Sequence, residues 1–185
     1  MLYTRKGDGG TTKDFKSGPG VRKSKSSCQT ESLGALDELN SFLGLVKVKA
    51  ADVFWSVNGK KPAEIAHWLQ NCLFTVQAEV AGADKRVGQA AIVETEAFTD
   101  AIEKELPPIK TFFISGGTEL AALFDVSRTL ARTAERRAVA AVEAKDIALD
   151  PATLAFLNRL SSLLYALARF SNHRQGITEQ APWYT

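Results

Sequence analysis

Apolar side chains recur every three or four residues along most of this 185-residue chain, which is the spacing of one helix face. In the stretch that starts at Pro62, for example, Ile65, Leu69, Leu73 and Val76 fall on one stripe. The same pattern predicts five helices, over residues 29–49, 62–83, 93–106, 118–144 and 151–174. Five helices without a sheet predict an all-α bundle with a core of the four-helix-bundle type, in a single domain spanning residues 1–185.

Proline and capping residues mark the ends of several of these helices. Pro107 ends the third helix, because proline lacks a backbone N–H and blocks helix continuation. Thr118 is placed to cap the fourth helix, and Asp150 precedes a helix that restarts at Pro151. Residues 109–117 (IKTFFISGG) are strand-like but have no partner of similar length, so we predict an extended segment there.

Residues 1–27 show no apolar period and form a glycine-rich leader, which begins MLYTRKGDGGTTKDF. Residues 1–26 hold seven Lys or Arg and two Asp, a net +5, whereas the rest of the chain holds 16 basic and 19 acidic residues. Two interpretations stay open: a frayed terminus or hairpin turn at Asp8-Gly9, or an anion-binding loop. Because the net positive charge lies in the leader, a small anionic ligand is favoured over a nucleic-acid partner, which would need a larger basic surface.

The composition is that of an ordinary globular protein, with 45% hydrophobic and 24% charged residues. No apolar run is long enough to span a bilayer, and the first residues lack a targeting pattern, so we expect a cytoplasmic protein without a membrane partner. Cys28 and Cys72 fit no metal pattern and are expected to be free thiols. The P-loop motif is absent, and His67 and His173 lack the spacing of metal ligands.

A stripe of charged residues on the fourth predicted helix is the strongest candidate site. Arg128, Arg132, Glu135 and Arg136 fall on one face, and guanidinium groups present a planar fork to phosphate. The alternative is a solvated face with internal Glu–Arg pairs. Asn158 on the last helix is either a surface residue or a ligand-binding amide, and spacing alone leaves both open.

Four segments, taken in order, resemble one known family. They are YTRKGDGGTT, LGALDELNSFLGL, FFISGGTELAALFDVSRTLARTAERR and FLNRLSSLLYALARFSNHR, and they cover about half of the chain. Together they look like the ATP:cob(I)alamin adenosyltransferases of the propanediol-utilisation (PduO) type. The resemblance implies a five-helix homotrimer with active sites between subunits, which transfers the 5′-deoxyadenosyl group of ATP to the cobalt of cob(I)alamin. Triphosphate is the second product, and Mg²⁺ accompanies the ATP.

The resemblance also implies roles for individual residues. The ATP-binding residues it implies are Thr4, Arg5, Lys6, Gly7, Thr12, Lys13 and Lys25 of the leader, with Arg132, Thr133, Glu135, Arg136 and Asn158 of the helices. Arg128 matches an arginine that pairs across the subunit interface with an aspartate, here Asp37. Phe112 matches an aromatic residue that faces the corrin and helps to exclude an axial base from cobalt. Mg²⁺ is expected on the ATP phosphates, with no ligand from the protein.

Several positions depart from the family pattern. Thr133 stands where a second arginine is common, Asp125 replaces a frequent histidine, and Ser162 replaces an aspartate. Ser27, Ser115 and Leu33 are further departures. Because Asp37, Arg128, Arg132, Glu135 and Asn158 are all present, an active enzyme is the favoured hypothesis.

Other functions stay open on the sequence. The first is a trimeric carrier or sensor that binds ATP or adenosylcobalamin without turnover. The second is a structural or nucleic-acid-binding bundle with the basic leader as a tail. A cobalamin reductase and an adenosylcobalamin-dependent mutase are possible protein partners of the enzyme.

Overall fold

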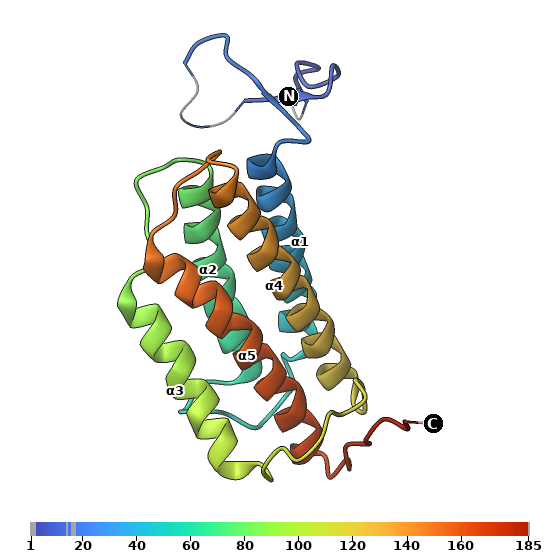
Figure 1. Cartoon of the computed structure of the whole chain (residues 1–185). Coiled ribbons are helices and arrows are strands. Elements are labelled where there is room, and N and C mark those ends of the chain that lie inside the picture. Colours follow the sequence, from blue (N-terminus) through green and yellow to red (C-terminus); the bar gives the residue numbers. More distant parts are fainter. Residues whose placement is uncertain (1–2, 14, 16–17, 185) are drawn as a thin grey trace.

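The computed structural model describes residues 3–13, 15 and 18–184, so residues 1–2, 14 and 16–17 of the predicted leader, and residue 185, lie outside the described part. Within it, five α-helices confirm the predicted all-α class (Figure 1). They are α1 (Cys28–Lys49), α2 (Pro62–Val80), α3 (Gln89–Glu105), α4 (Glu119–Glu143) and α5 (Pro151–Arg174). Helices α1, α4 and α5 begin and end within one residue of their predicted bounds. Helix α2 ends three residues before its predicted end, and α3 begins four residues before its predicted start.

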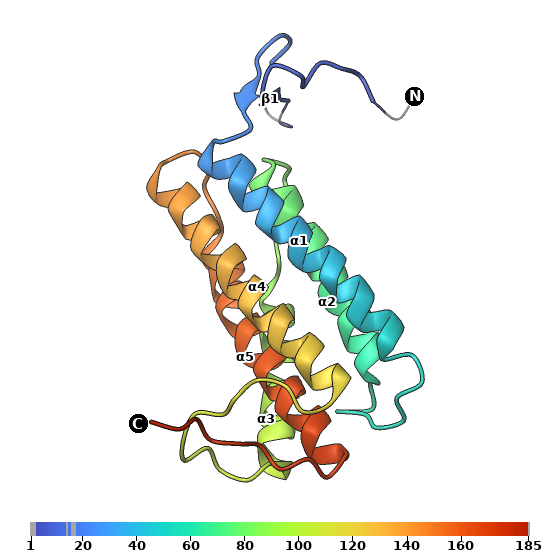
Figure 2. The same cartoon turned by 90° about the vertical axis from the view of Figure 1, so that its right-hand side faces the viewer.

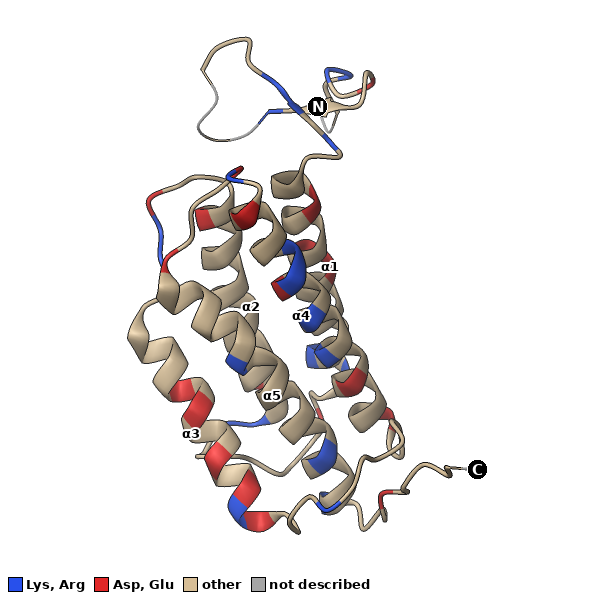
Figure 3. Ribbon diagram, viewed as in Figure 1, with Lys and Arg blue, Asp and Glu red and all other residues tan. Residues whose placement is uncertain are grey.

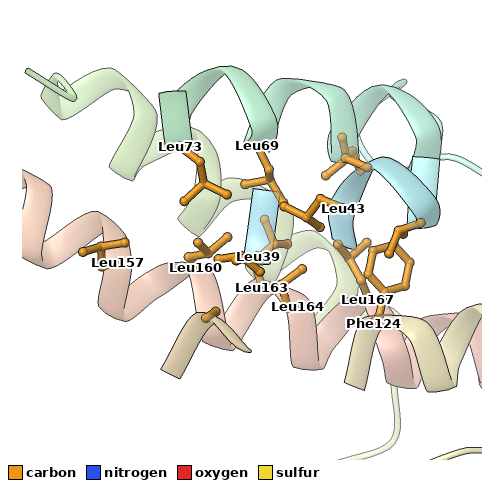
Figure 4. Packing of buried hydrophobic residues seen from close by; sticks show 14 of the residues in the cluster. Leu39, Leu43, Leu69, Leu73, Phe124, Leu157, Leu160, Leu163, Leu164 and Leu167 are labelled. Atoms are coloured by element: carbon orange, nitrogen blue, oxygen red, sulfur yellow. The ribbon is translucent and has the colours of Figure 1, made fainter. Parts of the chain in front are cut away.

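The helices pack in a chain of neighbours, α2 on α1, α1 on α4, α4 on α5 and α5 on α3. Leucines on the facing stripes of α1, α2 and α5 are fully buried and pack in one cluster with Phe124 of α4 (Figure 4). Burial of such a side chain contributes about 1.5–3 kcal/mol relative to exposure, so this core fixes the relative positions of the helices. Helices α4 and α5, which carry the predicted ATP-binding residues outside the leader, therefore rest on a closely packed support.

The predicted cap at Thr118 is confirmed, and Asp150 also caps the helix that was predicted to restart at Pro151. The Thr118 hydroxyl accepts a hydrogen bond from the Ala121 backbone N–H at 3.1 Å, at the start of α4. The Asp150 carboxylate accepts one from the Ala152 N–H at 2.8 Å, at the start of α5. Each cap satisfies a backbone donor that has no partner within its own helix.

The leader contains a small sheet, so the prediction of a chain without any sheet is wrong. Strands β1 (Thr11–Thr12) and β2 (Lys23–Ser24) pair in antiparallel fashion at the end of the bundle where α1 begins (Figure 2 labels β1). Two-residue strands are too short to show an alternating pattern, so periodicity could not reveal them. Asp8 and Gly9 lie in turns before β1 and not at the hairpin connection, which corrects that interpretation.

The residues between α3 and α4 form the predicted extended segment, since residues 107–117 adopt no helix or strand. Its end beside α4 is fixed by Asn172 of α5, which donates to the Gly116 carbonyl at 2.8 Å and accepts from the Thr118 N–H at 2.9 Å. Gly117 has φ +102°, and a Cβ there would collide with the Asn172 carboxamide. Glycine is therefore required at this close approach.

No helix in the described part of the chain is both long and apolar enough to cross a lipid bilayer. Both cysteines are free thiols, as predicted.

Candidate active site

A cavity of about 590 Å³ opens between the extended segment, α4 and α5. Phe112 and Phe113 contribute one wall, Arg128 and Arg132 a second, and Tyr165 of α5 the third. The Phe112 ring stands at the edge with 78% of its surface exposed. Three residues that the sequence singled out, Phe112, Arg128 and Arg132, thus share one pocket that joins apolar and cationic surface.

Arg128 lies in the wall of this cavity and has an intrachain carboxylate beside it. Its Nε lies 3.5 Å from Asp125 Oδ1, which is an ion-pair distance but does not give Nε a hydrogen bond. The guanidinium also lies over the Tyr165 ring, 5.9 Å from its centroid. Burial, the largest cause, raises the pKa of the Tyr165 phenol, so this side chain stays neutral beside the two arginines.

Asp125 also reaches the extended segment. Its Oδ2 accepts a hydrogen bond from the Gly116 N–H at 3.3 Å. One carboxylate therefore contacts both Arg128 and the segment that carries Phe112. A histidine at this position would lack the negative charge, so the departure noted in the sequence changes the electrostatics of this wall.

The arginine stripe of α4 does not form internal Glu–Arg pairs among the described residues. Glu135 accepts a hydrogen bond from the Asn158 amide at 3.0 Å instead. Arg136 donates to the Thr133 hydroxyl at 3.1 Å, and Arg132 has no hydrogen-bond or ion-pair partner in the described part of the chain. Figure 3 shows basic positions following one another along α4. Arg132 is exposed, so its guanidinium is available to an anion.

The leader is folded around its glycines. The Lys25 ammonium packs over Gly7, where a Cβ would lie 3.3 Å from Nζ, and the Lys25 N–H donates to the Gly10 carbonyl at 2.9 Å. Arg22 donates from Nε to the Thr11 hydroxyl and from Nη2 to the Thr11 carbonyl, both at 2.8 Å. This geometry brings together Gly7 and Lys25, two of the leader residues predicted to bind phosphate.

A second concave surface, of about 610 Å³, lies under the leader between α1 and α2. Thr12 and Lys13 line it together with Leu33 and Asp37 of α1. Asp37 is exposed there. Arg128 lines the cavity at α4 and α5, so a single chain does not bring Asp37 and Arg128 together.

Comparison with known proteins gives this geometry a chemical context. The family model described as cobalamin adenosyltransferase matches residues 2–171, nearly the whole chain. The chain belongs to the cobalamin adenosyltransferase family. A corrinoid adenosyltransferase of Bacillus subtilis is 35% identical over 178 residues, which are 95% of this chain and 89% of that protein.

Two further relatives extend the comparison to a longer protein and to a solved structure. The corrinoid adenosyltransferase PduO of Citrobacter freundii is 34% identical over 93% of this chain, which spans about half (50%) of that protein. A variant of the PduO-type ATP:corrinoid adenosyltransferase of Lactobacillus reuteri, complexed with cobalamin and ATP, superposes with a TM-score of 0.85. The identity is 26%, over 98% of this chain and 99% of that one.

Seen within the cobalamin adenosyltransferase family, the predicted site residues fall into two groups. The leader residues lie at the end of the bundle where α1 begins, and Asp37 lies on the adjoining face formed by α1 and α2. Phe112, Arg128, Arg132, Glu135 and Asn158 lie along the α4 and α5 face. Arg128, Arg132 and Glu135 could be read from the sequence because they share one stripe of α4, whereas Phe112 and Asn158 were assigned through the family resemblance.

Tyr165 of the cavity wall was missed, although the sequence carried a signal for it. Asn158, Ser162, Tyr165 and Arg169 stand at i, i+4, i+7 and i+11, one polar stripe along α5. Arg22 gave no such signal, because it lies in an irregular part of the leader.

Proposed function

We propose that this member of the family transfers the 5′-deoxyadenosyl group of ATP to the cobalt of cob(I)alamin. The observation that carries the proposal is the shared pocket, in which the ring of Phe112 faces the same space as Arg128 and Arg132. The cobalt(I) electron pair forms the new bond to C5′ of ATP. The C5′–O bond breaks, and the electron pair leaves with triphosphate, so the products are adenosylcobalamin and triphosphate.

The leaving group determines what the protein must supply. Triphosphate gains negative charge as the C5′–O bond breaks, and fixed cations and N–H donors stabilise that charge best when they are already in place. Arg132, which has no partner among the described residues, is a candidate for this role. Asn158 and Glu135 are hydrogen-bonded to each other and offer donors and acceptors to the nucleoside.

The leader supplies the other half of the ATP site in this proposal. Its phosphate-binding residues are Thr4, Arg5, Lys6, Gly7, Thr12, Lys13 and Lys25, and Thr133 and Arg136 of α4 border the helical half. The leader lies beside α1 and α2, whereas the cavity lies between α4 and α5, so one chain carries two half-sites on different faces. A homotrimer in which the leader of one subunit meets α4 of the next would complete the site and pair Arg128 with Asp37.

Magnesium is assigned to the nucleotide. The described residues contain no group of three His, Cys, Asp or Glu side chains that could hold a metal ion, and the leader offers basic and hydroxyl groups. Phosphate oxygens are the ligands that Mg²⁺ commonly shares with a few waters. Mg²⁺ on the phosphates would offset charge on the triphosphate of bound ATP.

Phe112 is assigned to the corrinoid side. Its exposed ring at the pocket edge presents an apolar surface that a planar macrocycle can cover. An apolar wall next to cobalt excludes water and axial bases from that face of the metal. Cobalt(II) without axial ligands is easier to reduce, which would favour formation of the cobalt(I) nucleophile by a reductase partner.

A carrier or sensor function is the second candidate, and Thr133 is the observation that favours it. The Thr133 hydroxyl donates to the Thr129 carbonyl at 3.2 Å and accepts from Arg136, so a neutral side chain occupies the place of a phosphate-binding arginine. Such a protein would hold adenosylcobalamin for a mutase without making it. Tight nucleotide binding with no turnover would distinguish this function from the enzyme.

An anaerobic assay with ATP, Mg²⁺ and reduced cobalamin tests the proposal. The wild-type protein should form a light-sensitive cobalt–carbon bond, and Arg132→Ala should reduce the rate about 100-fold or more. Arg137→Ala is the matched control, because Arg137 lies on the same helix but pairs with Glu31 of α1. If wild-type protein binds both substrates and forms no cobalt–carbon bond, the enzyme proposal is wrong and the carrier function is favoured.

A further inference from the structure

A single buried arginine joins three separate parts of the chain beneath the Phe112 segment. The side chain of Arg169 on α5 is only 6% exposed. Its Nε donates to Glu179 Oε2 at 2.9 Å and to Oε1 at 3.2 Å, and its Nη2 donates to the Pro107 carbonyl at 3.3 Å. The guanidinium also lies over the Phe113 ring, 5.0 Å from its centroid.

The residues after α5, 175–184, are bound to the same extended segment by a second link. The Ile114 N–H donates to the Gln180 carbonyl at 2.8 Å, one residue beyond the ion-paired Glu179. Figure 2 shows this tail running beside the segment that connects α3 to α4. The Phe112 segment is therefore linked both to α5 and to the tail, and Arg169 contacts the segment as well as the tail.

The segment depends on these contacts for its position. It adopts no helix or strand, so its backbone lacks the repeated hydrogen bonds that hold regular elements in place. The end beside α4 is fixed by Asn172, whereas the part that precedes it is held by Arg169, Glu179 and Gln180. The Phe112 ring itself is exposed, so its position follows from the backbone on either side of it.

We infer that Arg169 and Glu179 are positioning residues, which hold Phe112 at the edge of the corrinoid pocket by fastening the tail to the extended segment. This inference rests on the proposed function, since it gives the pair a role in corrinoid binding. Neither side chain lines the cavity that contains Phe112 and Arg128, so neither is a contact to the corrinoid in this arrangement.

Removal of Glu179 should act on both links. Without its carboxylate, a buried Arg169 guanidinium would be an unpaired charge, which is strongly unfavourable. The guanidinium would then move toward water and release Pro107 and Phe113, and the tail would lose its anchor. The helical bundle does not depend on the tail carboxylate, so the variant should still fold.

The test compares Glu179→Ala with Glu105→Ala in the full-length protein. Glu105 pairs with Arg174 at 2.7 Å, close to the same end of α5, but both side chains are about half exposed. In the described part of the chain, no hydrogen bond or ion pair joins either side chain to the extended segment. Two measurements are made on each variant: the KM values for cob(I)alamin and for ATP, and hydrogen exchange of the backbone amides of residues 107–116. Glu179→Asp keeps the charge and serves as the conservative variant.

We expect Glu179→Ala to raise the KM for cob(I)alamin about tenfold, as loss of a charged hydrogen bond would. The KM for ATP should stay within about twofold, and exchange of the Ile114 amide should accelerate about tenfold because its partner is on the tail. Glu179→Asp should recover part of both effects, and Glu105→Ala should show neither.

Two results would overturn the inference: unchanged exchange in Glu179→Ala, or faster exchange with an unchanged KM for cob(I)alamin. If the wild-type protein forms no cobalt–carbon bond, the proposed function fails. The exchange data and the affinity for cob(II)alamin then decide the positioning role by themselves.

Discussion

The carboxylate of Glu79 is buried where the C-terminal end of α2 meets the N-terminal end of α5, and its removal should be costly. The side chain is 1% exposed. It accepts hydrogen bonds from the Asp150 backbone N–H at 2.7 Å and from the Thr153 hydroxyl at 2.5 Å. Arg86 lies 3.5 Å from Oε1 and supplies the nearest positive charge. Glu79 thus fastens the start of α5, the helix that carries Asn158.

The size of the effect can be worked from these contacts. Each hydrogen bond to a charged group contributes about 1.5–3 kcal/mol, and the Glu79→Ala substitution leaves both donors without a partner. The half-exposed Arg86 adds little, because such ion pairs are worth about 0–1 kcal/mol. We therefore expect the free energy of unfolding to fall by about 3–5 kcal/mol. For a chain of this length that lowers the Tm by about 10 °C.

Urea denaturation followed by circular dichroism measures this difference, with Glu64→Ala as the matched control. Glu64 lies on the same helix and its carboxylate accepts a hydrogen bond from the exposed Lys61 N–H at 2.7 Å, a capping interaction worth about 1 kcal/mol. A loss of less than 1 kcal/mol for Glu79→Ala, or an equal loss for the two variants, would refute the reasoning. For Glu79→Gln, which keeps one acceptor oxygen, the loss in the free energy of unfolding should lie between the losses of the two alanine variants.

Three further predictions concern the leader, a thiol and the arginine stripe. Arg22→Ala removes both hydrogen bonds to Thr11 and should raise the KM for ATP about tenfold without a change in the KM for cob(I)alamin, and equal changes in both would contradict a local role. Burial raises the pKa of the Cys72 thiol to about 11 from an ordinary value of 9.0, so in a Cys28→Ser variant its alkylation at pH 8 should be about 100-fold slower than that of a free cysteine. A rate equal to that of free cysteine would show that Cys72 is not shielded. Thr133→Arg adds a cation beside Arg136 and should tighten ATP binding severalfold at low salt, an effect that 0.5 M salt should remove. Isothermal titration checks this, and salt-independent or weaker binding would count against a phosphate contact at position 133.

Local signals explain which parts of the fold could be predicted. The helices of the core follow from apolar spacing, and Thr118 and Asp150 cap helices through hydrogen bonds to residues two or three positions away. Both features are encoded within a few residues, so one sequence suffices to find them. The β1–β2 pair was missed because its two strands are eleven residues or more apart and only two residues long.

The candidate site divides in the same way. Arg128 and Arg132 could be placed on one face from helical spacing, but Phe112 joined them only through the family resemblance, because it lies in an irregular segment. The ion pair between Arg169 and Glu179 depends on how the tail turns back after α5, and no periodic pattern encodes that turn. The contact between Arg128 and Asp37 stays a prediction, since within one chain Arg128 lies beside Asp125.

The fit of Asn172 around Gly117 has a mechanical consequence for the extended segment. Because the Asn172 side chain bonds to Gly116 and Thr118 and leaves no room for a Cβ between them, the junction with α4 has one available geometry. Any displacement of Phe112 toward or away from a bound corrinoid must then be taken up by backbone rotation between Pro107 and Ser115. The rigid junction sets the centre of that motion, and the length of chain from it to Phe112 limits how far the ring can travel.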